Sequence, residues 1–196
     1  MAEEKKALRA VCRQKRSLIE NKEERSRLIV GNILGLSELK DAESLFLFYP
    51  LSDEVDLLPL FEYAVKACKK VGFPLCEDKD GAMTFRRVYS LDELVSGSFG
   101  TKEPRKDAPL LLPKNALILL PALAADKKGY RLGYGKGYYD RYLDSHKQLS
   151  PSTVTVIFKE LLVDAVPTDR FDVPCQKVVF EDGIITPQAP QKIQEA

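Results

Sequence analysis

Residues 126–141 carry the densest chemical signal of the chain, with five cations against two carboxylates. Gly133, Gly135 and Gly137 alternate there, so three backbone positions can adopt positive φ or let a ligand approach the main chain. Successive amide groups in such a loop, leading into a helix N-terminus, form an anion-binding concavity. Arg131 and Lys136 supply counter-charge. The segment therefore predicts a site for a phosphate-bearing ligand.

The spacing excludes two common phosphate loops. No Ser or Thr follows Lys136, as a P-loop requires, and the glycines do not form the dinucleotide pattern G-x-G-x-x-G. The alternative interpretation is a turn that only joins a strand to a helix. Three glycines, two cations and three aromatic residues between Arg131 and Tyr139 exceed what such a turn needs.

Histidine and cysteine usage argues against several other classes of site. His146 is the only histidine, so a Ser-His-Asp catalytic triad or a multi-histidine metal site is not expected. The four cysteines are scattered without a C-x-x-C pair, which indicates neither a zinc site nor a disulfide framework. Reduced thiols of a cytoplasmic protein are the simplest interpretation.

The whole-chain composition is that of an ordinary globular protein. The 196 residues carry a formal net charge of +1, which argues against a protein-wide field for binding nucleic acid. Two basic foci, residues 1–16 and 126–141, are hidden in that total. No apolar stretch reaches the roughly 20 residues of a membrane span. We expect one domain over residues 1–196, a cytoplasmic location and a monomer, since no long apolar stripe is left for a partner.

The elements that must position these residues follow an alternating pattern of strands and helices, which predicts an α/β protein with a largely parallel sheet flanked by helices. Residues 3–20 form an amphipathic N-terminal helix by spacing, with Val11, Cys12 and Leu18 on its apolar side and Arg9, Arg13 and Arg16 on its polar side. Further helices are expected at 22–36, at 55–70 with Val65 and Cys68 inward, and after Gly137. Strands are expected at 44–49, 73–76, 83–88, 116–120, 153–158, 178–180 and 184–186, with a turn at 77–81, a long loop at 96–114 and a frayed tail at 187–196.

The sequence R-L-G-Y-G-K-G-Y-Y-D at 131–140, preceded by P-A-L-A-A-D at 121–126, closely resembles the signature of the 5-formyltetrahydrofolate cyclo-ligase (5,10-methenyltetrahydrofolate synthetase) family. Three further family landmarks appear in the same order along nearly the whole chain. They are Lys5 to Arg9, similar to K-x-x-L-R; Asp53-Glu54, where the family has a folate-contacting glutamate; and Val166 to Asp172, where the family has a metal-binding aspartate. Read alone, Lys5 to Arg9 is more simply a solvated basic face and Asp172 a capping or surface carboxylate, whereas Asp53-Glu54 is equally compatible with a plain acidic turn.

The resemblance implies a set of roles, which we carry over residue by residue. ATP binding is implied for Lys5, Arg9, Arg131, Leu132, Gly133, Tyr134, Gly135, Lys136, Gly137, Tyr138 and Tyr139. Substrate binding is implied for Tyr49, Glu54, Tyr134, Gly135, Lys136, Gly137 and Tyr138. Mg²⁺ is implied at Asp140 and Asp172, and a catalytic role for Lys136 and Arg131. Two positions depart from the family pattern: Ala125 replaces a large aromatic residue, and Gln176 replaces an acidic one.

The implied reaction converts ATP and 5-formyltetrahydrofolate into 5,10-methenyltetrahydrofolate, ADP and phosphate. Phosphorylation of the formyl oxygen would turn it into a leaving group, and the folate's own N10 would then close the ring. Such chemistry needs positioning and charge stabilisation more than acid–base side chains, which suits a chain with one histidine. Two other classes stay open at this stage: a non-enzymatic nucleotide-sensing module, and a relative of sugar-phosphate isomerases or CoA-transferases.

Overall fold

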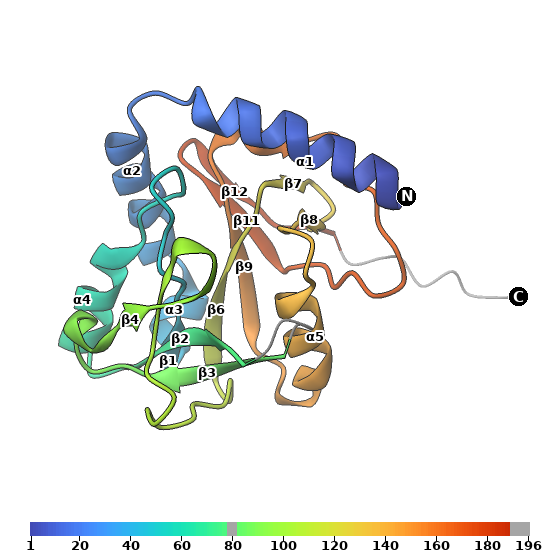
Figure 1. Ribbon diagram of the computed structural model, residues 1–196. Helices are drawn as coiled ribbons and strands as arrows, with labels where there is room; N and C mark the ends of the chain where they lie inside the picture. Colours follow the sequence, from blue (N-terminus) through green and yellow to red (C-terminus); the bar gives the residue numbers. More distant parts are fainter. Residues whose placement is uncertain (78–81, 189–196) are drawn as a thin grey trace, which may run out of the picture.

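The structure is a computed structural model that describes residues 1–77 and 82–188. A seven-stranded sheet with the order β12-β11-β9-β6-β1-β2-β3 forms its centre (Figure 1). The strands are β1 Ser44–Phe46, β2 Lys70–Cys76, β3 Met83–Arg87, β6 Ala116–Pro121, β9 Ser152–Val156, β11 Lys177–Phe180 and β12 Gly183–Ile185. The strands from β11 to β2 run parallel and both edge strands run antiparallel. The predicted α/β class is confirmed.

The helices are α1 Ala2–Ser17, α2 Lys22–Leu34, α3 Ser37–Asp41, α4 Leu58–Lys66 and α5 Tyr138–Ser145. Helix α4 connects β1 to β2 and α5 connects β6 to β9, and these two steps run in opposite directions along the sheet. Right-handed crossovers therefore place α4 and α5 on opposite faces. Helix α1 crosses one end of the sheet, above β7 and β8 (Figure 1). None of the described helices combines the length and the apolar character needed to cross a membrane.

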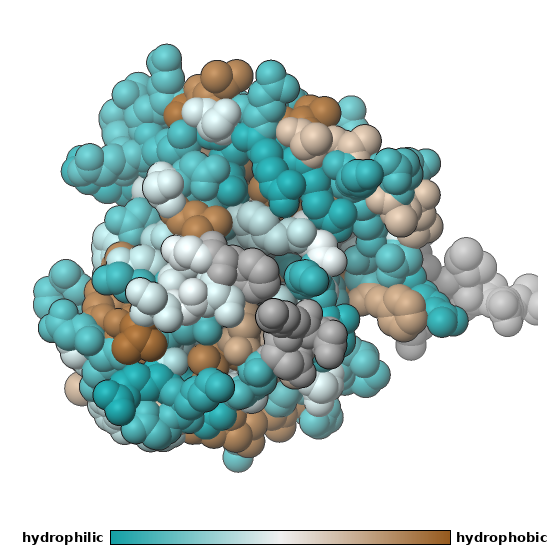
Figure 2. Space-filling view, in the orientation of Figure 1, coloured by the Kyte–Doolittle hydropathy of each residue, from teal (hydrophilic) through white to brown (hydrophobic). Residues whose placement is uncertain are grey.

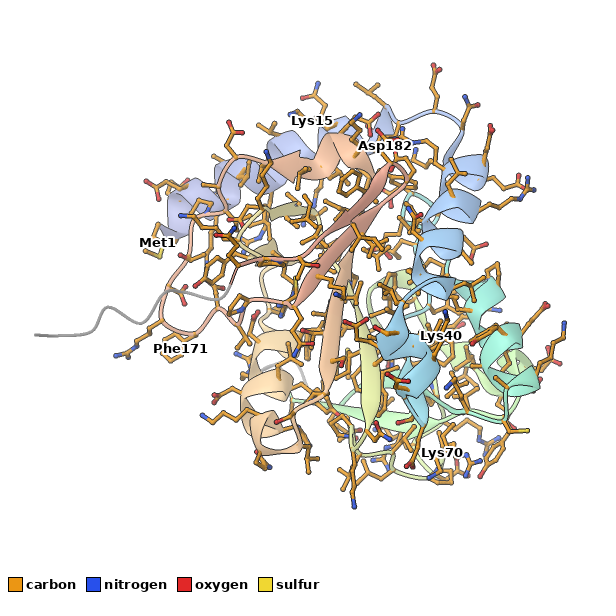
Figure 3. The ribbon with its side chains drawn as sticks, turned by 180° about the vertical axis from the view of Figure 1, so that it is seen from behind. Met1, Lys15, Lys40, Lys70, Phe171 and Asp182 are labelled. Atoms are coloured by element: carbon orange, nitrogen blue, oxygen red, sulfur yellow. The ribbon has the colours of Figure 1, made fainter. Side chains whose placement is uncertain are left out.

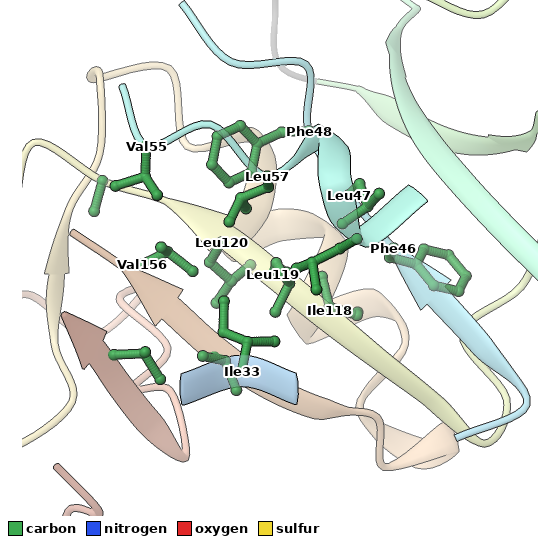
Figure 4. Packing of buried hydrophobic residues seen from close by; sticks show 14 of the residues in the cluster. Ile33, Phe46, Leu47, Phe48, Val55, Leu57, Ile118, Leu119, Leu120 and Val156 are labelled. Atoms are coloured by element: carbon green, nitrogen blue, oxygen red, sulfur yellow. The ribbon is translucent and has the colours of Figure 1, made fainter. Parts of the chain in front are cut away.

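The core is centred on β6, as its continuous apolar run predicts. Leu117, Ile118, Leu119 and Leu120 are all fully buried. Figure 4 shows Ile33 of α2 packed beneath Leu119 and Leu120 of this strand. Burying each such side chain contributes about 1.5–3 kcal/mol, so β6 is the rigid base from which the glycine-rich segment departs.

Short elements that the sequence does not reveal hold that segment in place. A three-stranded sheet β10-β7-β8 consists of β7 Ala124–Asp126, β8 Arg131–Leu132 and β10 Leu162–Val163. A small hairpin, β4 Val95–Ser96 with β5 Lys102–Glu103, interrupts the stretch predicted as a loop. Single 3₁₀ turns lie at Leu91–Glu93, Ser98–Gly100, Lys147–Leu149 and Lys159–Leu161. Strands of two or three residues carry too little pattern to be read from sequence.

Several predicted details are wrong. Strand β1 ends at Phe46, and α4 is shorter than the predicted helix, so that Cys68 lies beyond its end and is exposed. Val65 lies within α4 but on its outer side, and it is exposed as well. The prediction for helix α1 is confirmed in part: Cys12 is buried and Arg13 is exposed, as expected, but Val11 and Leu18 are exposed and Arg16 is only 4% exposed. The reason is that the inward face of α1 is mixed: Cys12 joins the hydrophobic core, and Arg16 on the same face pairs with Asp53. Most of the predicted turn at 77–81 and of the tail at 187–196 lies outside the described residues.

The topology also indicates where a ligand belongs. The chain leaves β1 and β6, which are adjacent, toward opposite sides of the sheet. In open α/β sheets, ligands bind outside the carboxyl ends of the strands at such a switch point. The segments that follow these two strand ends contain Glu54 and the glycine-rich loop, respectively.

Candidate active site

An open pocket of about 820 Å³ lies between the start of α1, the glycine-rich loop, α5 and the loop at 169–173. Figure 3 shows Met1 and Phe171 together at this end of the molecule. Ten of the predicted site residues line it: Lys5, Arg9, Arg131, Leu132, Gly133, Gly135, Lys136, Gly137, Asp140 and Asp172. The fold thus brings the two basic foci and both predicted metal ligands to one cavity, of a size that suits a nucleotide.

The glycine loop enters α5 through two left-handed residues. Gly135 has φ +109° and Gly137, the residue preceding α5, has φ +68°, conformations that glycine adopts without a steric penalty. A Cβ on Gly135 would stand 3.4 Å from Cζ of Arg9. Gly133 differs, because its φ is not positive and a Cβ there would meet nothing within 4 Å. Two of the three alternating glycines are therefore needed for the loop's conformation.

Asp126 and Arg131 fix the base of this loop from within. The buried carboxylate of Asp126 accepts hydrogen bonds from the amides of Lys128 (2.9 Å), Tyr130 (3.1 Å) and Val166 (2.9 Å). Arg131, whose side chain is 3% exposed, donates to Asp140 (2.8 Å) and to the carbonyl of Val173 (2.8 Å). The geometry of Arg131 therefore orients Asp140, and its predicted contact with phosphate stays a prediction.

Helix α1 closes the pocket from the other side. Lys5 Nζ lies 2.6 Å from Asp172 Oδ2 and 2.9 Å from Asp169 Oδ2, and Arg9 Nε donates to the carbonyl of Gly133 at 2.9 Å. Burial disfavours the charged form of Lys5, but the hydrogen bonds to the two aspartates outweigh it and raise its pKa. The same contact lowers the pKa of Asp169. The lysine is thus a fixed ammonium in the pocket wall.

Glu54 lies in a second cluster, at the carboxyl end of β1. Its Oε1 accepts hydrogen bonds from the hydroxyl of Tyr134 and from Arg16 Nη1 (3.5 Å), while Oε2 accepts one from the amide of Leu51 (2.8 Å). Burial, reinforced by the negative charge of Glu54, raises the pKa of Tyr134, so its hydroxyl stays protonated and donates. Tyr134 comes from the glycine loop, and this cluster therefore joins the loop to the Glu54 turn.

The remaining tyrosines are not among the residues that line the nucleotide-sized pocket. Tyr139 packs edge-on against Phe85, with ring centroids 6.3 Å apart, and burial raises its pKa, with Glu54 the next contribution. Tyr138 hydrogen-bonds to the Cys76 side chain. Tyr49 packs against the core and carries Lys102 Nζ 5.2 Å above its ring. Their predicted ligand contacts stay predictions.

The two predicted metal ligands offer the donor chemistry that Mg²⁺ prefers. Asp140 and Asp172 both line the pocket, and two carboxylates leave positions for phosphate oxygens and water, as is usual beside nucleotides. Among residues 1–77 and 82–188, no group of three or more His, Cys, Asp or Glu side chains is clustered for a metal. Oδ1 of Asp140 and Oδ2 of Asp172 already accept hydrogen bonds from Arg131 and Lys5, respectively, which leaves the other oxygen of each carboxylate for an ion; the assignment of these aspartates to Mg²⁺ stays a prediction.

The structure adds residues that the sequence interpretation did not assign to the site. Arg141, Asp169, Arg170 and Phe171 line the pocket, and Arg16 joins the Glu54 cluster. The sequence contained a signal for Arg16, because the spacing of Lys5, Arg9 and Arg16 puts all three on one helical face. The 169–171 segment has no such periodic signal.

Both departures from the family pattern have a structural setting. Ala125 is fully buried in β7, between its partners in the three-stranded sheet. Gln176 accepts a hydrogen bond from the amide of Thr153 at 3.2 Å, so it links β9 to the start of β11. The glutamine in that position therefore stabilises the pairing of the two strands.

Residues 1–181 match the sequence profile described as the 5-formyltetrahydrofolate cyclo-ligase family. A curated mouse (Mus musculus) protein named 5-formyltetrahydrofolate cyclo-ligase is 28% identical over 91% of this chain and 94% of its own length. The protein of the same name from Escherichia coli K12 is 30% identical over 70% of this chain and 78% of its own.

Solved structures agree with these sequence similarities. The Aquifex aeolicus 5,10-methenyltetrahydrofolate synthetase superposes with a TM-score of 0.80 at 32% identity, covering 97% of this chain and 96% of that one. The Mycoplasma pneumoniae 5,10-methenyltetrahydrofolate synthetase gives a TM-score of 0.72 at 22% identity over 90% and 98% of the two chains, a similarity of fold.

Proposed function

Because the chain belongs to the 5-formyltetrahydrofolate cyclo-ligase family and is an enzyme of that activity, we propose that it makes 5,10-methenyltetrahydrofolate from 5-formyltetrahydrofolate in a reaction driven by ATP and Mg²⁺. One observation carries the proposal beyond the family assignment. The pocket of about 820 Å³ gathers cations from both basic foci, an amide-rich loop and two carboxylates, which are the parts that phosphoryl transfer needs.

In the proposed first step, the formyl oxygen attacks the γ-phosphorus of ATP and the bond to ADP breaks. Lys136 and the amides around Gly135 and Gly137 stabilise the charge that moves onto the transferred phosphoryl oxygens. Lys5 and Arg9 add positive charge from the α1 side. Mg²⁺ held by Asp140 and Asp172 would supply further charge compensation beside the phosphate oxygens.

In the proposed second step, the folate's N10 attacks the formyl carbon and loses its proton, and the C–O bond breaks to release inorganic phosphate. The attack is intramolecular, so the protein needs only to hold the folate with N10 close to the formyl carbon. Glu54 provides acceptor oxygens that suit the N–H donors of a pterin ring. Tyr49, Tyr134 and Tyr138 are proposed to contact the ring.

We also propose that the enzyme works as a cytoplasmic monomer without nucleic-acid or membrane partners. The four cysteines are all free thiols, which suits a reducing compartment. Figure 2 shows a mostly hydrophilic face on which the hydrophobic side chains are scattered, and a stable homodimer usually needs a larger continuous apolar patch. Size-exclusion chromatography with light scattering tests the oligomeric state.

A single absorbance assay tests the proposed function. The protein is incubated with 5-formyltetrahydrofolate, Mg²⁺ and ATP, and methenyltetrahydrofolate absorbance is followed, with ATP omitted or EDTA added as controls. We expect product only in the complete mixture. ATP binding without turnover would favour a sensing module instead, and turnover without ATP would favour an isomerase-like or transferase-like reaction.

A further inference from the structure

Arg16 is a buried cation between the two ligand regions. It is 4% exposed and lies in the last turn of α1. Its Nε donates to Asp53 Oδ2 at 2.8 Å, and its Nη1 donates to the Tyr134 hydroxyl at 2.5 Å and to Glu54 Oε1 at 3.5 Å. The Arg16 guanidinium therefore contacts both the turn that contains Asp53 and Glu54 and the glycine loop that contains Tyr134, at the switch point of the sheet.

These contacts determine how Glu54 can be used. Arg16 donates to the Tyr134 hydroxyl, which donates in turn to the same Glu54 oxygen that Arg16 approaches. With the Leu51 amide on the other oxygen, three donors occupy three of the roughly four acceptor positions of the carboxylate. The Glu54 side chain is 7% exposed, so without Arg16 it would be a buried charge lacking a cation.

Helix α1 connects this cluster to the nucleotide-sized pocket. Lys5, Arg9 and Arg16 lie on one face of the helix, since steps of four and seven residues return to nearly the same angle. Lys5 and Arg9 line the pocket, and Arg16 lies about 16 Å from Lys5 and about 10 Å from Arg9 along the helix axis. A rigid helix thus spans both regions, with a charged contact at each end.

We propose that Arg16 is a positioning residue for the folate: it fixes Glu54 and Tyr134 in the orientation that receives the pterin, and it ties that orientation to the helix that closes the nucleotide pocket. The inference rests on the proposed function, in which Glu54 accepts hydrogen bonds from the pterin. The structure provides a matched control. Arg25, in α2, is also mostly buried, pairs with the carboxylates of Glu160 and Glu181, and lies over the Phe158 ring; it is not among the residues that line the nucleotide-sized pocket.

The test compares Arg16→Gln, Arg16→Lys and Arg25→Gln with the unchanged protein. Calorimetry measures the affinity for 5-formyltetrahydrofolate, steady-state kinetics gives KM for folate and for ATP, and thermal unfolding reports the fold. We expect Arg16→Gln to weaken folate binding and raise folate KM about tenfold or more, with ATP KM within twofold. Arg16→Lys restores part of the affinity, because it returns the charge but not the planar fork. Arg25→Gln lowers the melting temperature and leaves folate affinity unchanged.

A second variant covers the case in which Arg16→Gln does not fold. Asp53→Asn leaves the Arg16 charge in place and weakens only the contact that orients it, so we expect a rise of two- to fivefold in folate KM. Two results would overturn this inference alone. One is an unchanged folate affinity in both Arg16→Lys and Asp53→Asn. The other is an equal loss of folate affinity in Arg16→Gln and Arg25→Gln, accompanied by equal rises in the KM values for folate and ATP. Failure of the unchanged protein to bind or convert folate overturns the proposed function as well.

Discussion

Lys136 is the side chain whose loss the account expects to matter most for turnover. It is an exposed residue of the pocket wall, and within the described residues its ammonium has no ion pair. Lys136→Ala should reduce kcat about 100-fold or more, the usual cost of removing a donor that stabilises transition-state charge. Stability should change by less than about 0.5 kcal/mol, as for other exposed substitutions.

The control for this variant is Lys127→Ala, which removes a nearby exposed lysine that does not line the pocket. Steady-state kinetics and thermal unfolding of both variants check the expectation. Turnover in Lys136→Ala equal to that of Lys127→Ala would remove Lys136 from the proposed mechanism.

Glu54→Gln should affect the folate and spare the nucleotide. The amide replaces an acceptor oxygen by a donor nitrogen inside a cluster that already supplies donors, so we expect folate KM to rise about tenfold with ATP KM unchanged. Glu181→Gln is the matched control, since both glutamate side chains are 7% exposed and both pair with an arginine. Equal folate KM in the two variants would count against a pterin contact by Glu54.

Some residues of the candidate site could be identified from the sequence, and others could not. The glycine loop, Lys5 and Arg9 could be identified because their spacing carries a physical meaning, and the structure gathers them around one pocket. The sequence places Arg16 on the polar side of its helix without a role, because helical periodicity shows which residues share a side and not what that side contacts. The 169–171 segment reaches the pocket through a turn that is held by contacts of Lys5 with Asp169 and Asp172, which lie more than 160 residues away in the sequence.

The glycine loop as an element gives a prediction about backbone strain. Gly135→Ala forces an L-residue to φ +109° and brings its Cβ to 3.4 Å from the Arg9 guanidinium. We expect a loss of about 1–3 kcal/mol of stability, and weaker ATP binding because Arg9 must move. Gly133→Ala meets nothing within 4 Å and should cost much less stability.

Chemical denaturation of the two glycine variants, with calorimetric titration of a non-hydrolysable ATP analogue, checks this expectation. The decisive quantity is the difference in free energy of unfolding between the two variants, because both replace a glycine of the same loop by alanine. If Gly133→Ala destabilises the protein as much as Gly135→Ala, the positive φ does not control the loop.

Helices and strands could be predicted where the hydrophobic pattern is long and depends only on neighbouring residues in the sequence. The continuous apolar run of β6 predicted a central buried strand, and the structure confirms it. The orientation of α1 was predictable only in part: Cys12 joins the core as its spacing predicts, but the acidic partner of Arg16, Asp53, comes next to the helix only in the folded chain. The β10-β7-β8 sheet pairs strands of two or three residues, and its register depends on non-local contacts such as that between Asp126 and Val166.

The acid stability of the whole molecule depends in part on tertiary ion pairs. The hydrogen bond from Arg25 lowers the pKa of Glu160, and this pair links α2 to the turn before β10. A lowered folded-state pKa stabilises the protein above the unfolded value of about 4.3, and this contribution disappears as the pH falls through the folded value. Glu160 is 48% exposed, so solvent screening keeps the contribution to about 0.5 kcal/mol.

Thermal unfolding of the unchanged protein and Glu160→Gln between pH 7 and pH 3 tests this sign. The variant should be slightly less stable at pH 7, and the two curves should meet near pH 3. A difference that persists or grows at pH 3 would mean that the contact stabilises by packing and not by charge.

At the scale of the molecule, the net charge of +1 conceals the feature that matters. The two basic foci lie more than a hundred residues apart in the sequence, and the fold brings Lys5, Arg9 and Lys136 around one pocket. Composition could therefore exclude a polymeric polyanion and suggest a compact one, while only the topology shows where the two foci meet.

The central claim, phosphorylation of the formyl oxygen in this pocket, is tested most directly by isotope transfer. The substrate is 5-formyltetrahydrofolate labelled with ¹⁸O in the formyl group, turned over with unlabelled ATP and Mg²⁺. We expect one ¹⁸O atom in each released inorganic phosphate, detected by mass spectrometry, with none in ADP. Phosphate without label, formed while methenyltetrahydrofolate accumulates, would contradict it.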